Sequence, residues 1–270
     1  MDIYTDDTRN WLDDRFKRTD EEGIYFAHQP IYGFRKGHSE PGIIVRYIIT
    51  YQILKALSHL KFSSLLDVGG AEGYKAALIR KIFNVYVRSV DLSKEACSRA
   101  KEIYGIDSEQ VDSHRLPYQD NEFDIVLCSE TLEHVHNLQE STLELVRVCR
   151  NAVIITVPHE SKKRVEDNLR KKIPHGHIHS LDTSSFDFAR PAASEIISRR
   201  YHNPFIKVIA TMADAMKRNS INNYSKFIVN IFNFFVPIFS AIFRERSINW
   251  LIKLDDYISN TVPSYSGIIS

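Results

Sequence analysis

Residues 65–73 read Leu65-Leu66-Asp67-Val68-Gly69-Gly70-Ala71-Glu72-Gly73, and this stretch decides the fold of the chain. An apolar run ends in the carboxylate of Asp67 and passes directly into a turn of small residues. A helix-like segment follows from Tyr74 to Phe83. This order predicts a buried strand, a tight loop and the N-terminus of a helix, where backbone N–H groups can meet a ligand. The glycines allow the loop to take positive φ angles and to approach that ligand closely.

The spacing of the glycines excludes two common phosphate-binding loops. A dinucleotide-binding fingerprint has the order G-x-G-x-x-G, but counted from Gly69 the required positions hold Ala71 and Tyr74. A P-loop is excluded as well, because no Gly-Lys-Ser/Thr sequence follows. Asp67 and Glu72 would also repel a pyrophosphate at close range. A ligand with an ammonium group and no phosphate fits this turn better, and S-adenosylmethionine (SAM) is such a ligand.

Strand and helix patterns alternate along the rest of the chain. The sequence predicts strands over 85–90, 123–129, 152–158, 205–210 and 265–269, and helices over 43–60, 93–104 and 138–148. Continuous apolar strands separated by helices are typical of a parallel sheet with helices on both faces. Asp91 ends the second strand about twenty residues after the glycine turn, where a carboxylate can accept hydrogen bonds from both hydroxyls of a ribose.

Several ordered blocks of sequence together point to one family. They are D-V-G-G-A-E-G (67–73), V-D (90–91), D-S-H-R-L-P (112–117), F-D-I-V-L-C-S (123–129) and L-E-H-V (132–135). This series resembles the type 11 small-molecule methyltransferases of the class I SAM-dependent enzymes, over roughly residues 43–160. The chain departs from the family pattern at Ala71, where the middle glycine is usual. The resemblance implies an α/β fold: a Rossmann-like, doubly wound, mostly parallel seven-stranded sheet, with an N-terminal cap and a helical insertion before the last strand.

The resemblance also implies cofactor contacts, residue by residue. Asp67 and the glycine turn would hold the methionine end of SAM. Asp91 would hold the ribose, and Asp112 would reach the adenine amino group. The full set of cofactor residues implied in this way is Asp67, Gly69, Gly70, Ala71, Gly73, Asp91, Leu92, Asp112, Ser113 and Ser129. Asp91 also suits a helix N-cap, and Asp112 also suits a turn, so these structural alternatives stay open.

Methyl transfer from a sulfonium is an in-line displacement, so the protein mainly positions the acceptor and excludes water. A neutral hydroxyl acceptor must also lose a proton, which requires a base with a pKa near neutrality. His134 follows the fourth strand near the expected place of the sulfonium and is the predicted catalytic base, although a purely structural role fits it equally well. His136, His159 and His177 are the reserves. An oxygen acceptor is predicted ahead of carbon or nitrogen.

Segments on either side of the core are predicted to select the acceptor. The aromatic segment 24–34 is either a lid over the cofactor or a strap packed on the sheet, and its Tyr32 is a predicted substrate contact. The basic run 162–172 is either a solvated face or a site for an anionic acceptor. In an extended segment His175, His177 and His179 would share one face. No cysteine or carboxylate cluster adjoins them in the sequence, so no metal is predicted, and His177 is assigned to the substrate.

Residues 227–243 carry no charged side chain and lie between Lys226 and Arg244. These seventeen residues are at the lower limit for spanning a bilayer, and Asn230, Asn233 and Pro237 weaken that interpretation. The segment is instead predicted to form a hydrophobic hairpin or helix pair. It would cap the acceptor pocket, form a homodimer interface or make peripheral contact with a membrane.

Composition fits one compact cytoplasmic enzyme. The chain has 270 residues, a formal net charge of +1 and three scattered cysteines, which favours neither nucleic-acid binding nor a disulfide framework. The predicted parts are an N-terminal cap (1–42), a SAM-binding core (43–210), a hydrophobic helical insertion (211–262) and a final core strand (263–270). The predicted function is SAM-dependent methylation of a small, apolar, saccharide or lipid-linked metabolite. The alternative is a non-catalytic, methyltransferase-like partner subunit.

Overall fold

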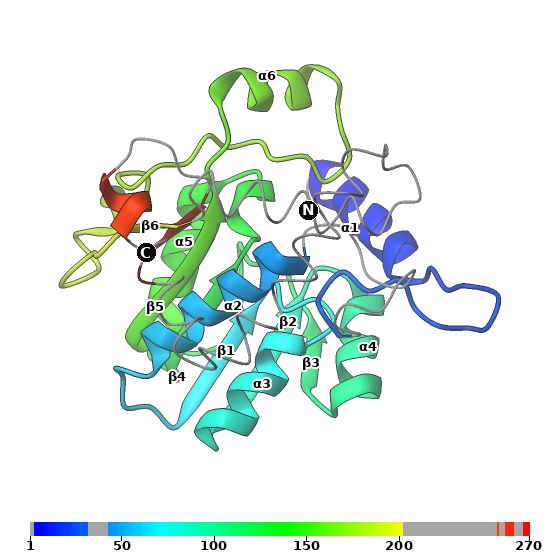
Figure 1. Ribbon diagram of the computed structural model, residues 1–270, viewed down its shortest axis with the longest axis horizontal. Coiled ribbons are helices and arrows are strands. Elements are labelled where there is room, and N and C mark those ends of the chain that lie inside the picture. Colours follow the sequence, from blue (N-terminus) through cyan, green and yellow to red (C-terminus); the bar gives the residue numbers. More distant parts are fainter. Residues whose placement is uncertain (1–2, 32–42, 202–252, 254–256, 262–266) are drawn as a thin grey trace, which may run out of the picture.

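The computed structural model describes residues 3–31, 43–201, 253, 257–261 and 267–270, and these contain a seven-stranded sheet in the order β3-β2-β1-β4-β5-β7-β6 (Figure 1). The strands are β1 (Ser64–Val68), β2 (Tyr86–Asp91), β3 (Asp107–Gln110), β4 (Phe123–Ser129), β5 (Cys149–Pro158), β6 (Arg199–Tyr201) and β7 (Gly267–Ile269). The pairs among β1 to β5 are parallel, whereas β7 runs antiparallel to β5 and β6. The predicted Rossmann-like, mostly parallel fold is therefore confirmed.

Helices cover both faces of this sheet. The α-helices are α1 (Ile3–Phe16), α2 (Ile43–Leu57), α3 (Tyr74–Phe83), α4 (Lys94–Tyr104), α5 (Leu138–Val148) and α6 (Lys162–Arg170), and the short 3₁₀ helices are η1 (Leu132–His134) and η2 (Asp187–Ala189). Alternate strand residues point to opposite faces. Leu65 and Leu127 belong to the core covered by α2 and α3, while Leu66 and Val126 belong to the opposite core, where α5 packs. Burial on both faces explains why the strands read as continuous apolar runs.

Strand register brings the candidate site residues to one edge of the sheet. Val68, the last residue of β1, pairs with Val90 of β2 and with Cys128 of β4, so the carboxyl ends of the three strands lie level. In such sheets ligands bind outside these carboxyl ends. Figure 1 shows α1 and α6 at the same edge, beyond the strand ends.

Some of the predicted strands and helices lie at other positions in the structure. The third strand is Asp107–Gln110, a polar segment without the apolar pattern that marked the other core strands. The sixth strand is Arg199–Tyr201, and the predicted strand at 205–210 lies outside the described residues. The described part of the cap contains a 14-residue helix, α1, which the sequence pattern did not indicate. Tyr32 and residues 227–243 also lie outside the described part. None of the described helices has the length and apolar character to cross a membrane.

Candidate functional site

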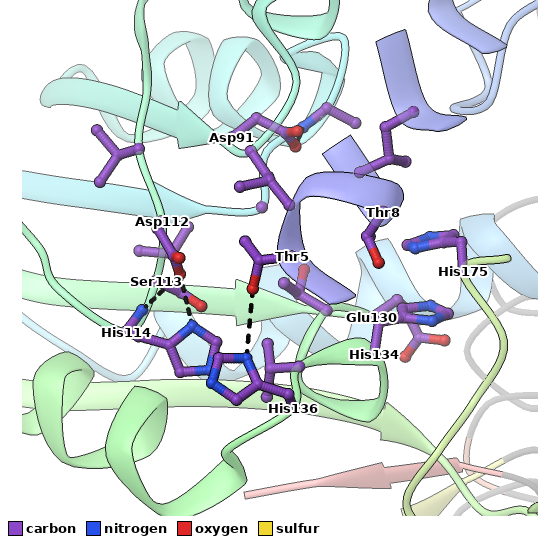
Figure 2. A pocket seen from close by; sticks show the side chains of 18 of the residues that line it. Thr5, Thr8, Asp91, Asp112, Ser113, His114, Glu130, His134, His136 and His175 are labelled. Carbon is purple, nitrogen blue, oxygen red and sulfur yellow. Dashed lines mark hydrogen bonds and ion pairs between the residues drawn. The ribbon is translucent and has the colours of Figure 1, made fainter. Parts of the chain in front are cut away.

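A cavity lies over the carboxyl ends of β1 to β4, and α1 closes one side of it (Figure 2). We call it the first cavity. Its lining includes Gly69, Ala71, Asp91, Leu92, Asp112 and Ser113 from the predicted cofactor set. The other lining residues come mainly from α1 and from the segment that follows β4: Thr5, Thr8, Leu12, Arg15, Phe16, His28, Val68, Val111, His114, Glu130, Thr131, His134, Val135, His136 and His175.

The loop after β1 has the left-handed backbone that its glycines predicted. Gly69 and Gly73 have φ values of 73° and 78°, and Ala71 between them has φ 48°. A Cβ atom at Gly69 would overlap the side chain of Thr131, so glycine is required there for space as well as for conformation. Ala71, where the family usually has glycine, thus also takes a left-handed conformation. A left-handed alanine costs about 1 kcal/mol relative to glycine.

Asp91 joins this loop to the next helix. Its Oδ2 accepts a hydrogen bond from Ala71 N at 2.9 Å, and its Oδ1 accepts one from Ser93 N at 2.9 Å. The side chain lines the first cavity, and burial raises the pKa of its carboxyl. Asp91 therefore shapes the loop, and the remaining lone pairs of its two oxygens are available to a ribose.

Asp67 lies behind the loop and lines neither the first cavity nor a second cavity that adjoins it. Its side chain is almost fully buried, and its Oδ2 makes no hydrogen bond with any residue that the structure describes. Burial raises the pKa of this carboxyl to about 6. Gly70 and Gly73 likewise line neither cavity. These three members of the predicted cofactor set therefore stabilise the loop without facing a cavity.

Asp112 faces the first cavity from the turn after β3. Its Oδ1 lies 2.5 Å from His114 Nδ1 and accepts a hydrogen bond from His114 N at 3.0 Å. Burial alone would raise the pKa of Asp112, but the bonds from His114 outweigh it and lower this pKa. The His114 ring stacks on His136 with centroids 3.9 Å apart, and His136 Nδ1 lies 3.4 Å from Thr5 Oγ1 of α1. This pair of histidines, which the sequence interpretation did not assign to the cofactor, closes the end of the cavity near Asp112.

Glu72 fastens the N-terminal segment to the loop. It is fully buried and accepts hydrogen bonds from His28 N and Gln29 N, both at 2.8 Å, and it pairs with Arg99 at 3.4 Å. The Gln29 side chain accepts a bond from Tyr74 N and donates one to Gly70 O. Residues 28–29 are therefore held against the loop by hydrogen bonds, while His28 also lines both the first cavity and the one that adjoins it.

A second cavity adjoins the first. The two share Arg15, His28, Gly69, Ala71, Glu130, His134 and His175. Further residues line only the second cavity: Trp11, Gln29, Pro30, Val45, Arg46, Ile49, Thr50, Tyr74, Lys75, Ser129, Glu133, Pro174 and His177. Among the described residues its wall combines cationic, acidic and imidazole side chains with apolar ones such as Val45 and Ile49. Ser129 and His177 thus belong to this cavity.

The turn after β4 forms the wall between the two cavities. Glu130 has φ 57°, a conformation that non-glycine residues rarely take and that recurs at functional sites. Its N–H donates to Thr156 O at 2.8 Å, and its Oε1 accepts from Tyr201 OH at 3.3 Å. Glu133 is only 1% exposed, and burial together with the nearby Glu130 raises its pKa well above the usual range.

His134 lies at the centre of an aromatic group on this wall. Its ring stacks on His175 with centroids 3.6 Å apart and meets His177 edge-on at 4.9 Å. His175 in turn stacks on Trp11 of α1 at 5.1 Å. Burial, followed by the proximity of His175 and His177, lowers the pKa of His134 well below its ordinary value. The imidazole is therefore neutral at pH 7.

The other predicted histidines have different places. His179 Nε2 lies 2.6 Å from Val135 O, so of the three histidines in 175–179 only His175 and His177 contact His134. His159, a reserve base, lies with its Nδ1 2.6 Å from Leu181 O and lines neither cavity.

The family described as a methyltransferase domain matches residues 66–157, which carry the loop, the strand ends and His134. This segment is thus similar in sequence to methyltransferase domains. Norajmaline N-methyltransferase from Rauvolfia serpentina is 30% identical over 147 residues, a match covering 48% of this chain and 50% of that enzyme. The chain thus spans about half the length of this curated relative. The match of the methyltransferase domain agrees with SAM as the predicted cofactor.

Solved structures extend the similarity of fold beyond the methyltransferase domain. Phosphoethanolamine N-methyltransferase 2 from Haemonchus contortus, in complex with SAM, superposes with a TM-score of 0.56 at 18% identity, covering 97% of this chain and 58% of that one. Geranyl diphosphate C-methyltransferase from Streptomyces coelicolor superposes with a TM-score of 0.55 at 14% identity, covering 99% and 96%. At these identities the likeness concerns the fold.

Proposed function

We propose that this chain is a SAM-dependent methyltransferase that binds SAM in the first cavity and a small acceptor in the second. The observation that carries the proposal is the shared wall, where Glu130, His134 and Ala71 line both cavities. Two adjoining cavities with a common wall allow donor and acceptor to be held in line, which is the main task of the protein in such a transfer.

The residues of the first cavity fit SAM. The left-handed turn at Gly69 and Ala71 presents backbone rather than side chain to the cavity, and a carboxylate stands at the end of β2 and another after β3. Asp91 and Leu92 would hold the ribose, and Asp112 and Ser113 the adenine. When bound, SAM supplies a methyl group already activated by the sulfonium.

The acceptor atom that we propose is a hydroxyl oxygen of a small polar molecule, such as a saccharide. His134 would then receive the hydroxyl proton, since its ring lines both cavities and stacking on His175 fixes its orientation. Its lowered pKa keeps the imidazole unprotonated at pH 7, but makes it a weaker base than the near-neutral one expected from the sequence. A nitrogen acceptor is the second candidate, because the carboxylates of Glu130 and Glu133 in the second cavity would attract an ammonium group and could take the proton whose loss frees the nitrogen lone pair.

Calorimetric titration with SAM tests the proposal most directly. We expect the wild-type chain to bind SAM and Asp91→Ala to bind it at least tenfold more weakly. Asp124→Ala is a matched control: Asp124 and Asp91 are each 7% exposed, but Asp124 lies at the opposite end of the sheet, where it accepts hydrogen bonds from Ser63 and pairs with Arg150. Both variants lose stability, so only the loss of SAM affinity distinguishes them.

A failure of folded wild-type protein to bind SAM would contradict the proposal and favour the non-catalytic partner subunit. If SAM binds, transfer of a labelled methyl group to a panel of hydroxyl and amine acceptors separates the two acceptor classes.

A further inference from the structure

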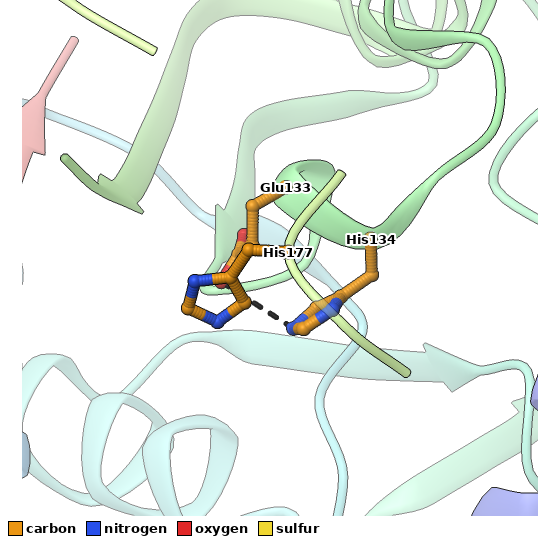
Figure 3. Close-up of side chains that lie close together, drawn as sticks. All are labelled: Glu133, His134 and His177. Carbon is orange, nitrogen blue, oxygen red and sulfur yellow. Dashed lines mark ion pairs between the residues drawn. The ribbon is translucent and has the colours of Figure 1, made fainter. Parts of the chain in front are cut away.

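Three side chains from two segments distant in the sequence meet in the second cavity (Figure 3). Glu133 and His134 come from η1, and His177 comes from the segment after α6. One donor atom from each lies within 4.8 Å of the other two. We propose that Glu133, His134 and His177 bind a divalent transition-metal ion. The sequence interpretation had predicted no metal, because it found no carboxylate beside the histidines along the chain.

The state of Glu133 supports a cation at this place. Its side chain is 1% exposed, and its Oε2 makes no hydrogen bond with any described residue. Its other oxygen, Oε1, lies 3.6 Å from His134 Nε2. A buried carboxylate is costly unless a charge or hydrogen bonds compensate it. A metal ion between these ligands would provide that compensation.

Both histidines are oriented as metal ligands usually are. Ligating imidazoles commonly use their second ring nitrogen to bond a backbone carbonyl or a carboxylate. Nδ1 of His134 lies 3.2 Å from Gly176 O, and Nδ1 of His177 lies 3.2 Å from Glu160 Oε1. With Nδ1 donating in each ring, Nε2 carries the lone pair. Stacking on His175 further fixes the plane of the His134 ring.

The donor set selects the class of metal. Two imidazole nitrogens and one carboxylate oxygen suit Zn²⁺, Fe²⁺, Mn²⁺ or Co²⁺, whereas Mg²⁺ and Ca²⁺ prefer oxygen ligands throughout. Three protein ligands also leave at least one coordination position, as in metal sites that bind a further molecule. Other charged side chains line the same cavity: Glu130 adds negative charge, whereas Arg15, Arg46 and Lys75 oppose a cation.

The role of the ion rests on the proposed methyl transfer, whereas the test of metal binding does not depend on it. An oxygen of the acceptor would take the open position, so the ion would bind and orient the acceptor beside the wall shared with the first cavity. With the ion bound, His134 would serve as a ligand instead of a base, and the Glu130 carboxylate, which also lines both cavities, would receive the hydroxyl proton.

Zinc titration of the full chain after chelator treatment tests the site. We expect one Zn²⁺ per chain, with affinity reduced at least 100-fold in His177→Ala and in Glu133→Gln, and about tenfold in Glu160→Gln, which removes only the carboxylate behind His177. The matched control is His59→Ala, because His59 is exposed and lines neither cavity. Bound Co²⁺ should give visible absorption bands in the wild type that the two ligand variants lose.

SAM titration of the same samples shows that each variant is folded and measures the proposed function separately. The metal proposal is overturned if wild-type protein that binds SAM fails to bind Zn²⁺ saturably, or if His177→Ala binds Zn²⁺ as tightly as the wild type. Metal binding without SAM binding would support the site while contradicting the proposed methyl transfer.

Discussion

The walls of the two cavities are built in different ways. Around the predicted SAM contacts, the first cavity consists of short turns directly after β1, β2 and β3, held by main-chain bonds such as those from Gly69 N and Gly70 N to Val90 O. The second cavity is lined largely by side chains from α1, α2, η1 and residues 174–177. Local backbone geometry thus shapes the strand-end wall of the first cavity, whereas packing between distant segments shapes the second cavity.

The largest effect should come from Gly69→Ala. The new Cβ would overlap the Thr131 side chain, and φ 73° adds the cost of a left-handed alanine. Together these costs lower the free energy of unfolding by about 4 kcal/mol and abolish SAM binding. Urea unfolding and SAM titration measure the two losses.

Gly105→Ala is the matched control for Gly69→Ala. Gly105 also has a left-handed φ, 59°, but no atom lies within 4 Å of the place of its Cβ. It should cost only about 1 kcal/mol and leave SAM affinity unchanged. Equal losses in the two variants would show that the contact with Thr131 does not shape the first cavity.

Asp67→Asn should have the next largest effect, and one that depends on pH. The pKa of Asp67 rises from 3.8 to about 6 on folding, so the folded chain binds more protons and loses stability as the pH rises between these values. The loss corresponds to about 3 kcal/mol and is complete above pH 7. The asparagine variant lacks this titration and should be more stable than the wild type at pH 7.5, but not at pH 4.

Asp124→Asn should change the stability at pH 7.5 in the opposite direction. Hydrogen bonds from Ser63 lower the pKa of Asp124 to about 2, so this carboxylate contributes stability above pH 4 that is lost as the pH falls toward 2. The variant should therefore be less stable than the wild type at pH 7.5. If both substitutions destabilise the chain equally at pH 7.5, burial of Asp67 does not raise its pKa.

The difference between the cavities also explains what the sequence could predict. The loop at 67–73, Asp91 and Asp112 lie in short motifs at strand ends, so the fold and the strand-end wall of the first cavity follow from local order. Asp67 was the exception, because its motif does not reveal that the side chain turns inward beneath Gly70.

The second cavity could be predicted only in part. His134 and His177 were candidates separately, yet their contact with each other, and with the buried Glu133, depends on how residues 174–177 pack against η1. The part played by α1 was missed for the same reason. Its residues Trp11 and Phe16 contact partners far along the chain, and no pattern over neighbouring residues records that.

Two reciprocal variants in α1 test whether the cavities are independent. Trp11→Leu removes the ring that stacks on His175, a contact contributing about 1 kcal/mol, and should weaken Zn²⁺ binding several-fold through a less fixed His134. Trp11 lines only the second cavity and Phe16 only the first, so Phe16→Leu should instead weaken SAM binding. Calorimetry with both ligands checks this. If each variant weakened the binding of both ligands equally, the two cavities would not be independent.

The smallest effect concerns Ala71, the residue that separates this chain from the usual family pattern. Ala71→Gly relieves a left-handed alanine at φ 48°, which gains about 1 kcal/mol, but it also loosens the unfolded chain, which offsets about half of that gain. The net result should be a stabilisation of about 0.5 kcal/mol in urea unfolding, with SAM affinity unchanged. Both outcomes follow if Asp91 fixes the loop by accepting the bond from the N–H of residue 71, which either residue supplies. A destabilisation instead would mean that the methyl group of Ala71 packs usefully against α1, and that the first cavity also depends on contact between distant segments.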